Sequence, residues 1–158
     1  MDKVIDIQYI LQTLGLTLLF VGFIGFERQR KHKIAGLTTH ILVALGAFGV
    51  TIVQEYMVQD AIEFIRANPE LAGSIVVQRQ RIIAQVVTGV GFLGAGAILK
   101  TNGYISGLTT ASSLWISAII GIIFASGYYE LGIIISVTAV IVLTLVKRVF
   151  KSSYQSTN

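Results

Sequence analysis

The sequence predicts an all-α polytopic membrane protein with about five transmembrane helices. The chain of 158 residues is 54% hydrophobic and 13% charged, whereas roughly 25% of the residues in soluble domains are charged. Its mean hydropathy is +0.77. Apolar stretches of about twenty residues, the length that crosses a bilayer, alternate with short charged segments. The chain has no cysteine, which excludes a disulfide framework and a thiolate metal site.

The charged residues that flank the apolar stretches place the five spans. They lie at about 8–26, 37–56, 82–99, 107–127 and 131–147. The first span is not a cleavable signal peptide, because its leader "MDKVID" is acidic and no small-x-small cleavage site follows. We expect residues 1–150 to form a single transmembrane domain and 151–158 a short cytoplasmic tail.

Two short phrases occur twice and divide the first four spans into two pairs. "GFIG" (22–25) ends the first span and "GLTT" (36–39) opens the second. "GFLG" (91–94) lies in the third span and "GLTT" (107–110) opens the fourth. Since the first and third spans cross in the same direction, the two pairs predict a parallel internal repeat. The fifth span is left unpaired.

Each phrase has a local physical role. The hydroxyls of Thr38, Thr39, Thr109 and Thr110 can satisfy the free N–H groups of a helix start. Alternatively, two such positive helix ends could hold an anionic group. We expect four glycines to serve helix packing by letting another backbone approach, although gaps in transporter helices are also rich in glycine. These glycines are Gly22, Gly25, Gly91 and Gly94.

The fourth span carries small residues at every fourth position, namely Ser113, Ser117, Gly121 and Ala125. Such a stripe predicts close contact with another helix. The partner is either the second span of the same chain or a second copy. A homo-oligomer such as a dimer, or a complex with other membrane proteins, is therefore expected.

The segment 57–81 is longer than a turn. Its pattern predicts either an amphipathic helix that lies on the outer interface or a projection of the second helix beyond the membrane. "NPE" (68–70) then provides a break, with Asn68 as a cap and Pro69 at the first helical position.

The basic residues predict the orientation. Eight lie on one side of the five spans and four on the other. The larger set is Arg28, Arg30, Lys31, Lys33, Lys100, Lys147, Arg148 and Lys151, and the smaller is Lys3, Arg66, Arg79 and Arg81. The positive-inside rule places the larger set in the cytoplasm and the N-terminus outside. This topology also explains the "ERQRKHK" run (27–33), whose alternative interpretation is a lipid-phosphate or nucleic-acid patch; no nucleic-acid partner is expected.

Ionisable groups at membrane depth would mark a functional site, and the sequence offers few. The candidate polar cluster is Glu27, Arg28, Thr38, Thr39, His40, Gln85, Thr109 and Thr110. Glu55 and Glu130 are expected at outer helix ends, solvated. A Mg²⁺ path would be expected to carry carboxylates within the membrane, and none is predicted there. No nucleophile–base pair is evident, so no catalysis and no cofactor are expected.

Three stretches resemble the MgtC/SapB family of bacterial inner-membrane proteins. They are "GFIGFERQRKHKIAGLTTHILVALGA" (22–47), "RIIAQVVTGVGFLGAGAIL" (81–99) and "GLTTASSLWISAIIG" (107–121). The family pattern carries over at Gly25, Glu27, Arg28, Gly36, His40, Arg81, Gln85, Gly91, Gly94, Gly107, Thr109 and Thr110. It departs at Thr38, where the family tends to have Arg, and at Gln78-Arg79, where it tends to have Asp-Pro.

The resemblance implies a role in magnesium homeostasis, in growth at low Mg²⁺ and, in some pathogens, in survival inside host cells. The family is often labelled a Mg²⁺ transporter, although its better-studied members resemble regulators of other membrane proteins. Longer members carry a soluble C-terminal domain that we expect this chain to lack. The leading hypothesis is a regulator that contacts membrane proteins; the alternative is a transporter of Mg²⁺ or another small ion or solute, with a path between the two repeats.

Overall fold

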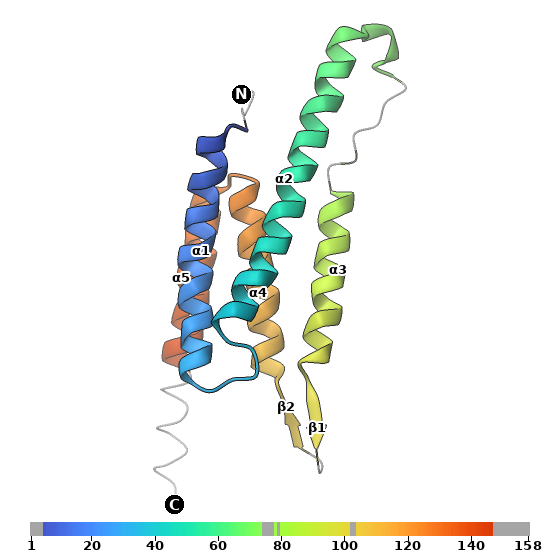
Figure 1. Cartoon of the computed structure of the whole chain (residues 1–158). Helices are drawn as coiled ribbons and strands as arrows, with labels where there is room; N and C mark the ends of the chain where they lie inside the picture. Colours follow the sequence, from blue (N-terminus) through green and yellow to red (C-terminus); the bar gives the residue numbers. More distant parts are fainter. Residues whose placement is uncertain (1–4, 74–77, 79, 102–103, 147–158) are drawn as a thin grey trace, which may run out of the picture.

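The protein is a bundle of five α-helices that run alternately in opposite directions (Figure 1). The computed structural model describes residues 5–73, 78, 80–101 and 104–146. The helices are α1 (Ile7–Arg30), α2 (Leu37–Ala67), α3 (Arg81–Gly96), α4 (Leu108–Ala125) and α5 (Tyr129–Ile141). A 3-10 turn, Pro69–Leu71, follows α2, and a π-helical turn, Val142–Val146, continues α5. The predicted five-helix, all-α class is confirmed, and the predicted tail at 151–158 lies outside the described residues.

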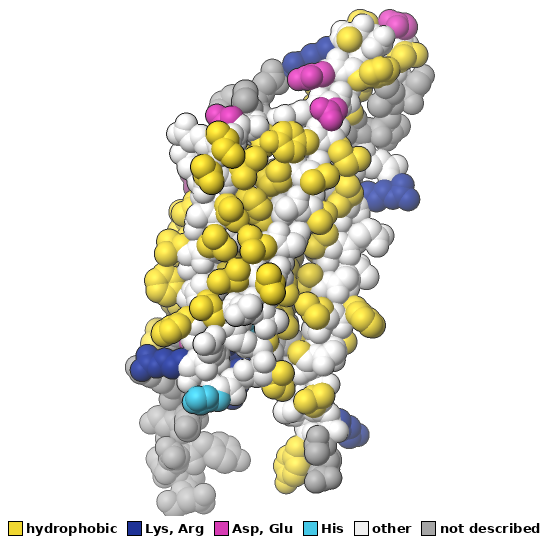
Figure 2. All heavy atoms as spheres, in the orientation of Figure 1, with side chains coloured by type: hydrophobic (Ala, Val, Ile, Leu, Met, Phe, Trp, Pro, Cys, Tyr) yellow, Lys and Arg dark blue, Asp and Glu magenta, His cyan; other side chains and the backbone are white. Residues whose placement is uncertain are grey.

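Three of the helices, α1, α2 and α4, are long and apolar enough to cross a membrane, whereas Arg81–Gly96 and Tyr129–Leu145 are shorter apolar helices. Figure 2 shows hydrophobic side chains over the middle of the visible face, with acidic side chains gathered at the end where α2 projects. This distribution fits a hydrocarbon layer around the middle of the bundle.

Local contacts explain where α1 and α2 begin. Asp6 caps α1, because its Oδ1 accepts a hydrogen bond of 2.7 Å from the Tyr9 amide. Arg28 and Arg30 occupy the last turn of α1, where cations interact favourably with the helix dipole. At the start of α2, the Leu37 amide donates to Gln29 Oε1 over 3.1 Å. A side chain of α1 therefore supplies the cap that we had predicted from the threonines.

The expected threonine caps are wrong for both copies of "GLTT". Gly36 and Gly107 are the N-cap residues of α2 and α4, so neither N-cap residue has a side chain that could accept a hydrogen bond from its own helix start. The Asn68 side chain likewise makes no cap bond to the turn that follows it. Its Nδ2 donates backwards to the Phe64 carbonyl at 2.9 Å. Pro69 does occupy the beginning of that turn, as predicted.

The segment after the second predicted span continues α2 without a break to Ala67. Of the two alternatives for this segment, the structure therefore shows the projecting helix (Figure 1). Glu55 lies within α2 and is only 7% exposed, so the expectation of a solvated carboxylate at a helix end is wrong. Gln54 beside it is also buried, and its Oε1 accepts from the Ile83 amide of α3 at 3.3 Å.

Between α3 and α4 the chain forms a β-hairpin that was not predicted. Strands β1 (Leu99–Thr101) and β2 (Tyr104–Ser106) pair antiparallel, with Lys100 opposite Ile105. This hairpin ends α3 at Gly96, earlier than the predicted boundary near 99. It protrudes from the same end of the bundle as the α1–α2 loop (Figure 1), and we call this end the hairpin end.

Helix α4 forms the centre of the bundle and packs against α1, α2, α3 and α5, most extensively against α2. The central apolar cluster includes Val21, Ile24, Ala44, Ile120 and Phe124. A Cβ atom added to Gly121 would lie 2.6 Å from the carbonyl oxygen of Ala44. The small-residue stripe of α4 therefore packs at Gly121 against α2 of the same chain.

Candidate functional site

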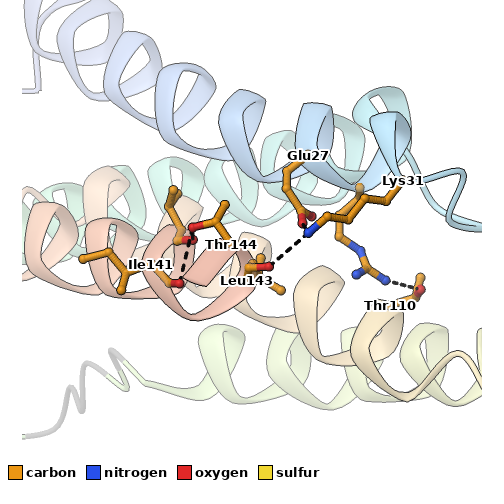
Figure 3. A network of polar contacts seen from close by, with 8 residues as sticks. Glu27, Lys31, Thr110, Ile141, Leu143 and Thr144 are labelled. Atoms are coloured by element: carbon orange, nitrogen blue, oxygen red, sulfur yellow. Dashed lines mark hydrogen bonds and ion pairs between the residues drawn. The ribbon is translucent and has the colours of Figure 1, made fainter. Parts of the chain in front are cut away.

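A polar cluster lies at the hairpin end, where α1 finishes and both α2 and α4 begin. Arg28 is the largest of the fully buried side chains in the described part of the chain, with 1% of its surface exposed. Its Nη2 donates a hydrogen bond of 2.7 Å to Thr110 Oγ1 in the first turn of α4 (Figure 3). This bond joins α1 to α4.

The remaining donors of Arg28 are poorly satisfied. Its Nε and Nη1 are buried and have no hydrogen-bond partner among the described residues. A buried charge is costly unless it is paired and fully hydrogen-bonded. The positive ends of α2 and α4 lie nearby and add to the positive potential of the guanidinium. The guanidinium and the two helix starts are thus all positive at this junction, and Glu27, the residue before Arg28 on α1, supplies a carboxylate beside them.

His40 links α2 to the same helix start. Its Nδ1 lies 2.6 Å from the Gly36 carbonyl oxygen, and its Nε2 lies 2.9 Å from Ser113 Oγ on α4. Because a carbonyl oxygen can only accept, Nδ1 carries a proton. Ser113 Oγ is also 2.9 Å from the Thr110 carbonyl. Two side-chain contacts, Arg28 to Thr110 and His40 to Ser113, thus hold α1 and α2 to the first two turns of α4.

Glu27 faces a different partner from Arg28. Its Oε1 forms an ion pair with Lys31 Nζ one turn later on α1, and that ammonium also donates to the Leu143 carbonyl at 3.4 Å (Figure 3). Glu27 Oε2 is buried without a hydrogen-bond partner among the described residues. The pair therefore ties the end of α1 to the π-helical turn after α5.

The other candidate polar residues lie outside this cluster. Thr38 and Thr39 are exposed and Thr109 is half-buried. Gln85 is exposed in the second turn of α3, whereas the hairpin follows the last turn of that helix. The structure thus brings Glu27, Arg28, His40 and Thr110 to one end and separates Gln85 from them.

The predicted packing residues divide into two groups. A Cβ added to Gly25 would meet the Leu37 Cα at 2.8 Å, and one added to Gly94 would meet Ala111 at 3.5 Å. One added to Gly22 or Gly91 would meet no atom within 4 Å. Of the stripe on α4, Ser113 and Ser117 are buried together with Gly121. The last glycine of each "GFxG" phrase, Gly25 or Gly94, therefore packs on the first residues of the next α-helix, α2 or α4. The space beside the first glycine of each phrase, Gly22 or Gly91, is empty.

Sequence reasoning missed three polar contacts. Ser113 was expected to pack, Lys31 was expected to set orientation or to belong to a lipid-phosphate or nucleic-acid patch, and Gln54 was not considered. The spacing of Glu27 and Lys31, four residues apart on a helix, was a usable sign of an ion pair. The long-range partners of Ser113 and Gln54 had no comparable sign. In the described residues no group of three or more His, Cys, Asp or Glu side chains could hold a metal ion.

Comparison with known proteins agrees with this architecture. The family model described as "MgtC family" matches residues 14–152. The chain is 45% identical over 130 residues to YhiD of Escherichia coli strain K12, covering 81% of this chain and 56% of YhiD. It is 39% identical over 109 residues to protein MgtC of Brucella abortus strain 2308, covering 69% and 39%. It is 38% identical over 122 residues to protein SapB of Bacillus subtilis strain 168, covering 77% and 49%.

The chain thus spans about half the length of these curated relatives, or less. No solved structure matches it. The family match includes the whole polar cluster at the hairpin end, from Glu27 to Ser113. The chain belongs to the MgtC family.

Proposed function

We propose that this chain is a bacterial inner-membrane protein that serves adaptation to low Mg²⁺ by contacting other membrane proteins or a second copy of itself. The family supports the magnesium role, since YhiD is named as a candidate magnesium transporter. The proposal includes no catalytic activity. The observation that carries the preference for regulation over transport is the buried guanidinium of Arg28 at the junction of α1 and α4.

Arg28 argues against a Mg²⁺ path between the two helix pairs. Such a path would pass the starts of α2 and α4, where the guanidinium and two helix dipoles all repel cations. Arginine residues and positive helix ends exclude cations from selective pores in the same way. The exposed surface of α3 supports a role in contacting other membrane proteins. Gln85, Gly89 and Gly91 are exposed on it, and no atom lies within 4 Å of a Cβ added to either glycine. Polar and small side chains on a membrane helix favour association with another helix.

The first prediction concerns Arg28→Met. Methionine keeps most of the side-chain volume and removes a poorly paired buried charge, so the thermal midpoint in detergent is expected to stay within about 4 °C of the parent or to rise. Rescue of a deletion strain at low Mg²⁺ is expected to be lost. Lys33→Met removes an exposed charge from the adjacent loop and should rescue normally. Normal rescue by Arg28→Met would contradict the proposed role of this cluster.

A transport assay separates the two functional hypotheses. Purified protein in liposomes is expected to give no Mg²⁺ influx above that of empty vesicles. Saturable flux that Glu27→Ala abolishes would instead support the transporter alternative and overturn the regulatory proposal.

The second prediction concerns orientation. We propose that the hairpin end faces the cytoplasm, because Arg30, Lys31, Lys33 and Lys100 are exposed there. Since the chain has no cysteine, a single introduced cysteine is the only residue of the protein that a maleimide reagent can label through a thiol. In intact cells a membrane-impermeant maleimide is expected to label Glu63→Cys, near the end of α2. It is expected to label Lys33→Cys only after the membrane has been permeabilised. The reverse pattern would invert the proposed topology.

A further inference from the structure

A groove of about 520 Å³ lies between α1 and α5 at the hairpin end. Its apolar walls come from both helices, with Phe23 and Phe26 on α1 and with Val140 on α5 and Leu145 on the π-helical turn after it. Arg30 and Lys31 line the same groove at the end of α1. The groove therefore combines a hydrophobic wall with two cations at one end.

The apolar wall is open to an occupant from the bilayer. Phe23 and Phe26 are 58% and 57% exposed, and Leu145 is 53% exposed. Phe23 and Phe26 are three residues apart and so lie on one face of α1. In a membrane protein this surface meets hydrocarbon, so an acyl chain can cover it at no cost in polar desolvation.

The side chains of Arg30 and Lys31, the two cations of the groove, differ in their contacts with the rest of the protein. The Lys31 ammonium is held above α5 by its contacts with Glu27 and with the Leu143 carbonyl, 3.4 Å away. Arg30 is exposed and makes no ion pair with any described residue. Counting the Glu27 carboxylate, the described residues that line the groove carry a net charge of +1, and the buried Arg28 adds a further positive field. Basic pockets between transmembrane helices are suited to lipid phosphates.

We propose that this groove binds one anionic phospholipid, with its phosphate at Arg30 and Lys31 and an acyl chain along Phe23, Phe26 and Leu145. A free phosphate would leave the aromatic wall without a contact. A zwitterionic lipid would need an acceptor for its ammonium group, yet Glu27 Oε1 is engaged by Lys31 and Oε2 is buried. The proposal does not depend on the magnesium function.

The test uses the full chain in mixed micelles of dodecyl maltoside with phosphatidylglycerol, phosphatidylcholine or inorganic phosphate. At a saturating concentration, phosphatidylglycerol is expected to raise the thermal midpoint by about 5 to 10 °C. Native mass spectrometry is expected to show one retained phosphatidylglycerol molecule. An equal shift with phosphatidylcholine would indicate general lipid solvation, and an equal shift with phosphate would indicate a free-anion site. Either result would overturn the proposal.

Two variants of the groove are expected to change lipid binding in opposite directions, and misfolding would not produce both changes. Arg30→Gln is expected to weaken phosphatidylglycerol binding about fivefold, the effect of one interfacial cation. Glu27→Gln releases Lys31 for the phosphate, so it is expected to tighten binding by a similar factor. Lys33→Gln neutralises an exposed cation that does not line the groove and should change binding less than twofold. Weaker binding by Glu27→Gln, or a loss by Lys33→Gln equal to that of Arg30→Gln, would refute the site.

Discussion

Gly107→Ala is expected to cause a larger loss of stability than alanine at the other glycines whose surroundings the structure describes. Gly107 is the N-cap residue of α4 and has a φ of +87°, a region that costs an alanine about 1–2 kcal/mol. Its added Cβ would also overlap the carbonyl oxygen of Ala97, which is backbone and cannot rotate away. The two effects together are expected to lower the free energy of unfolding by about 3 kcal/mol or more.

The measurement is the thermal midpoint of the purified protein in detergent, which should fall by at least about 6 °C. The matched control is the other copy of the same tetrapeptide. Gly36 has a φ of −107°, and the three atoms nearest to its added Cβ belong to the Gln29 side chain, at 3.2 to 3.4 Å. Gly36→Ala is therefore expected to lower the midpoint by no more than about 4 °C. Equal effects at the two glycines would show that the αL conformation of Gly107 is not what the hairpin requires.

Gly121→Val is expected to separate α2 from α4. The added Cβ would lie 2.6 Å from the Ala44 carbonyl oxygen and 3.4 Å from the Phe48 amide nitrogen, and valine adds two further methyl groups. Overpacking of this kind costs about 1–3 kcal/mol and sometimes more. Because this is the most extensive helix contact of the bundle, we expect the upper part of that range. The Nε2–Oγ contact between His40 and Ser113 crosses the same interface and should weaken with it.

Gly121→Val is measured by the yield of monodisperse protein after detergent extraction and by the thermal midpoint, which should fall by about 6 °C or more. Gly46→Val provides the control, since Gly46 lies on the exposed face of α2 with no atom within 4 Å of an added Cβ. It should leave both measurements near the parent values. A stable Gly121→Val protein would mean that α2 and α4 pack more loosely than the structure indicates.

The helices could be predicted from sequence because hydropathy and flanking charge decide them locally. The β-hairpin was missed, although the sequence between its strands is Asn-Gly, the dipeptide most typical of two-residue hairpin loops. Its strands are only three residues each and, apart from Leu99, fell in the segment 100–106 that was predicted to be a loop between two spans. The length of α2 stayed open because an amphipathic pattern is the same on a membrane surface and in a projecting helix.

The polar cluster could be predicted in composition but not in pairing. Glu27, Arg28, His40 and Thr110 were identified as polar residues near helix ends, which is a local property. That Arg28 contacts Thr110 while Glu27 contacts Lys31 depends on which face of α1 meets α4. The pattern of charges in the sequence does not reveal how α1 is rotated about its own axis relative to α4. The predicted internal repeat stays a prediction, supported by the equivalent packing of Gly25 and Gly94 on the two following helices.

The unequal lengths of α2 and α3 have a consequence for the surrounding lipid. Over 16 residues α3 rises about 24 Å, and over 31 residues α2 rises about 46 Å, whereas the hydrocarbon core is about 30 Å thick. Hydrophobic mismatch beside α3 is relieved when the bilayer thins locally, at a fraction of a kcal/mol per ångström. Lipids with shorter chains are therefore expected to gather along α3, so that bilayer thickness would influence where in the membrane this protein accumulates.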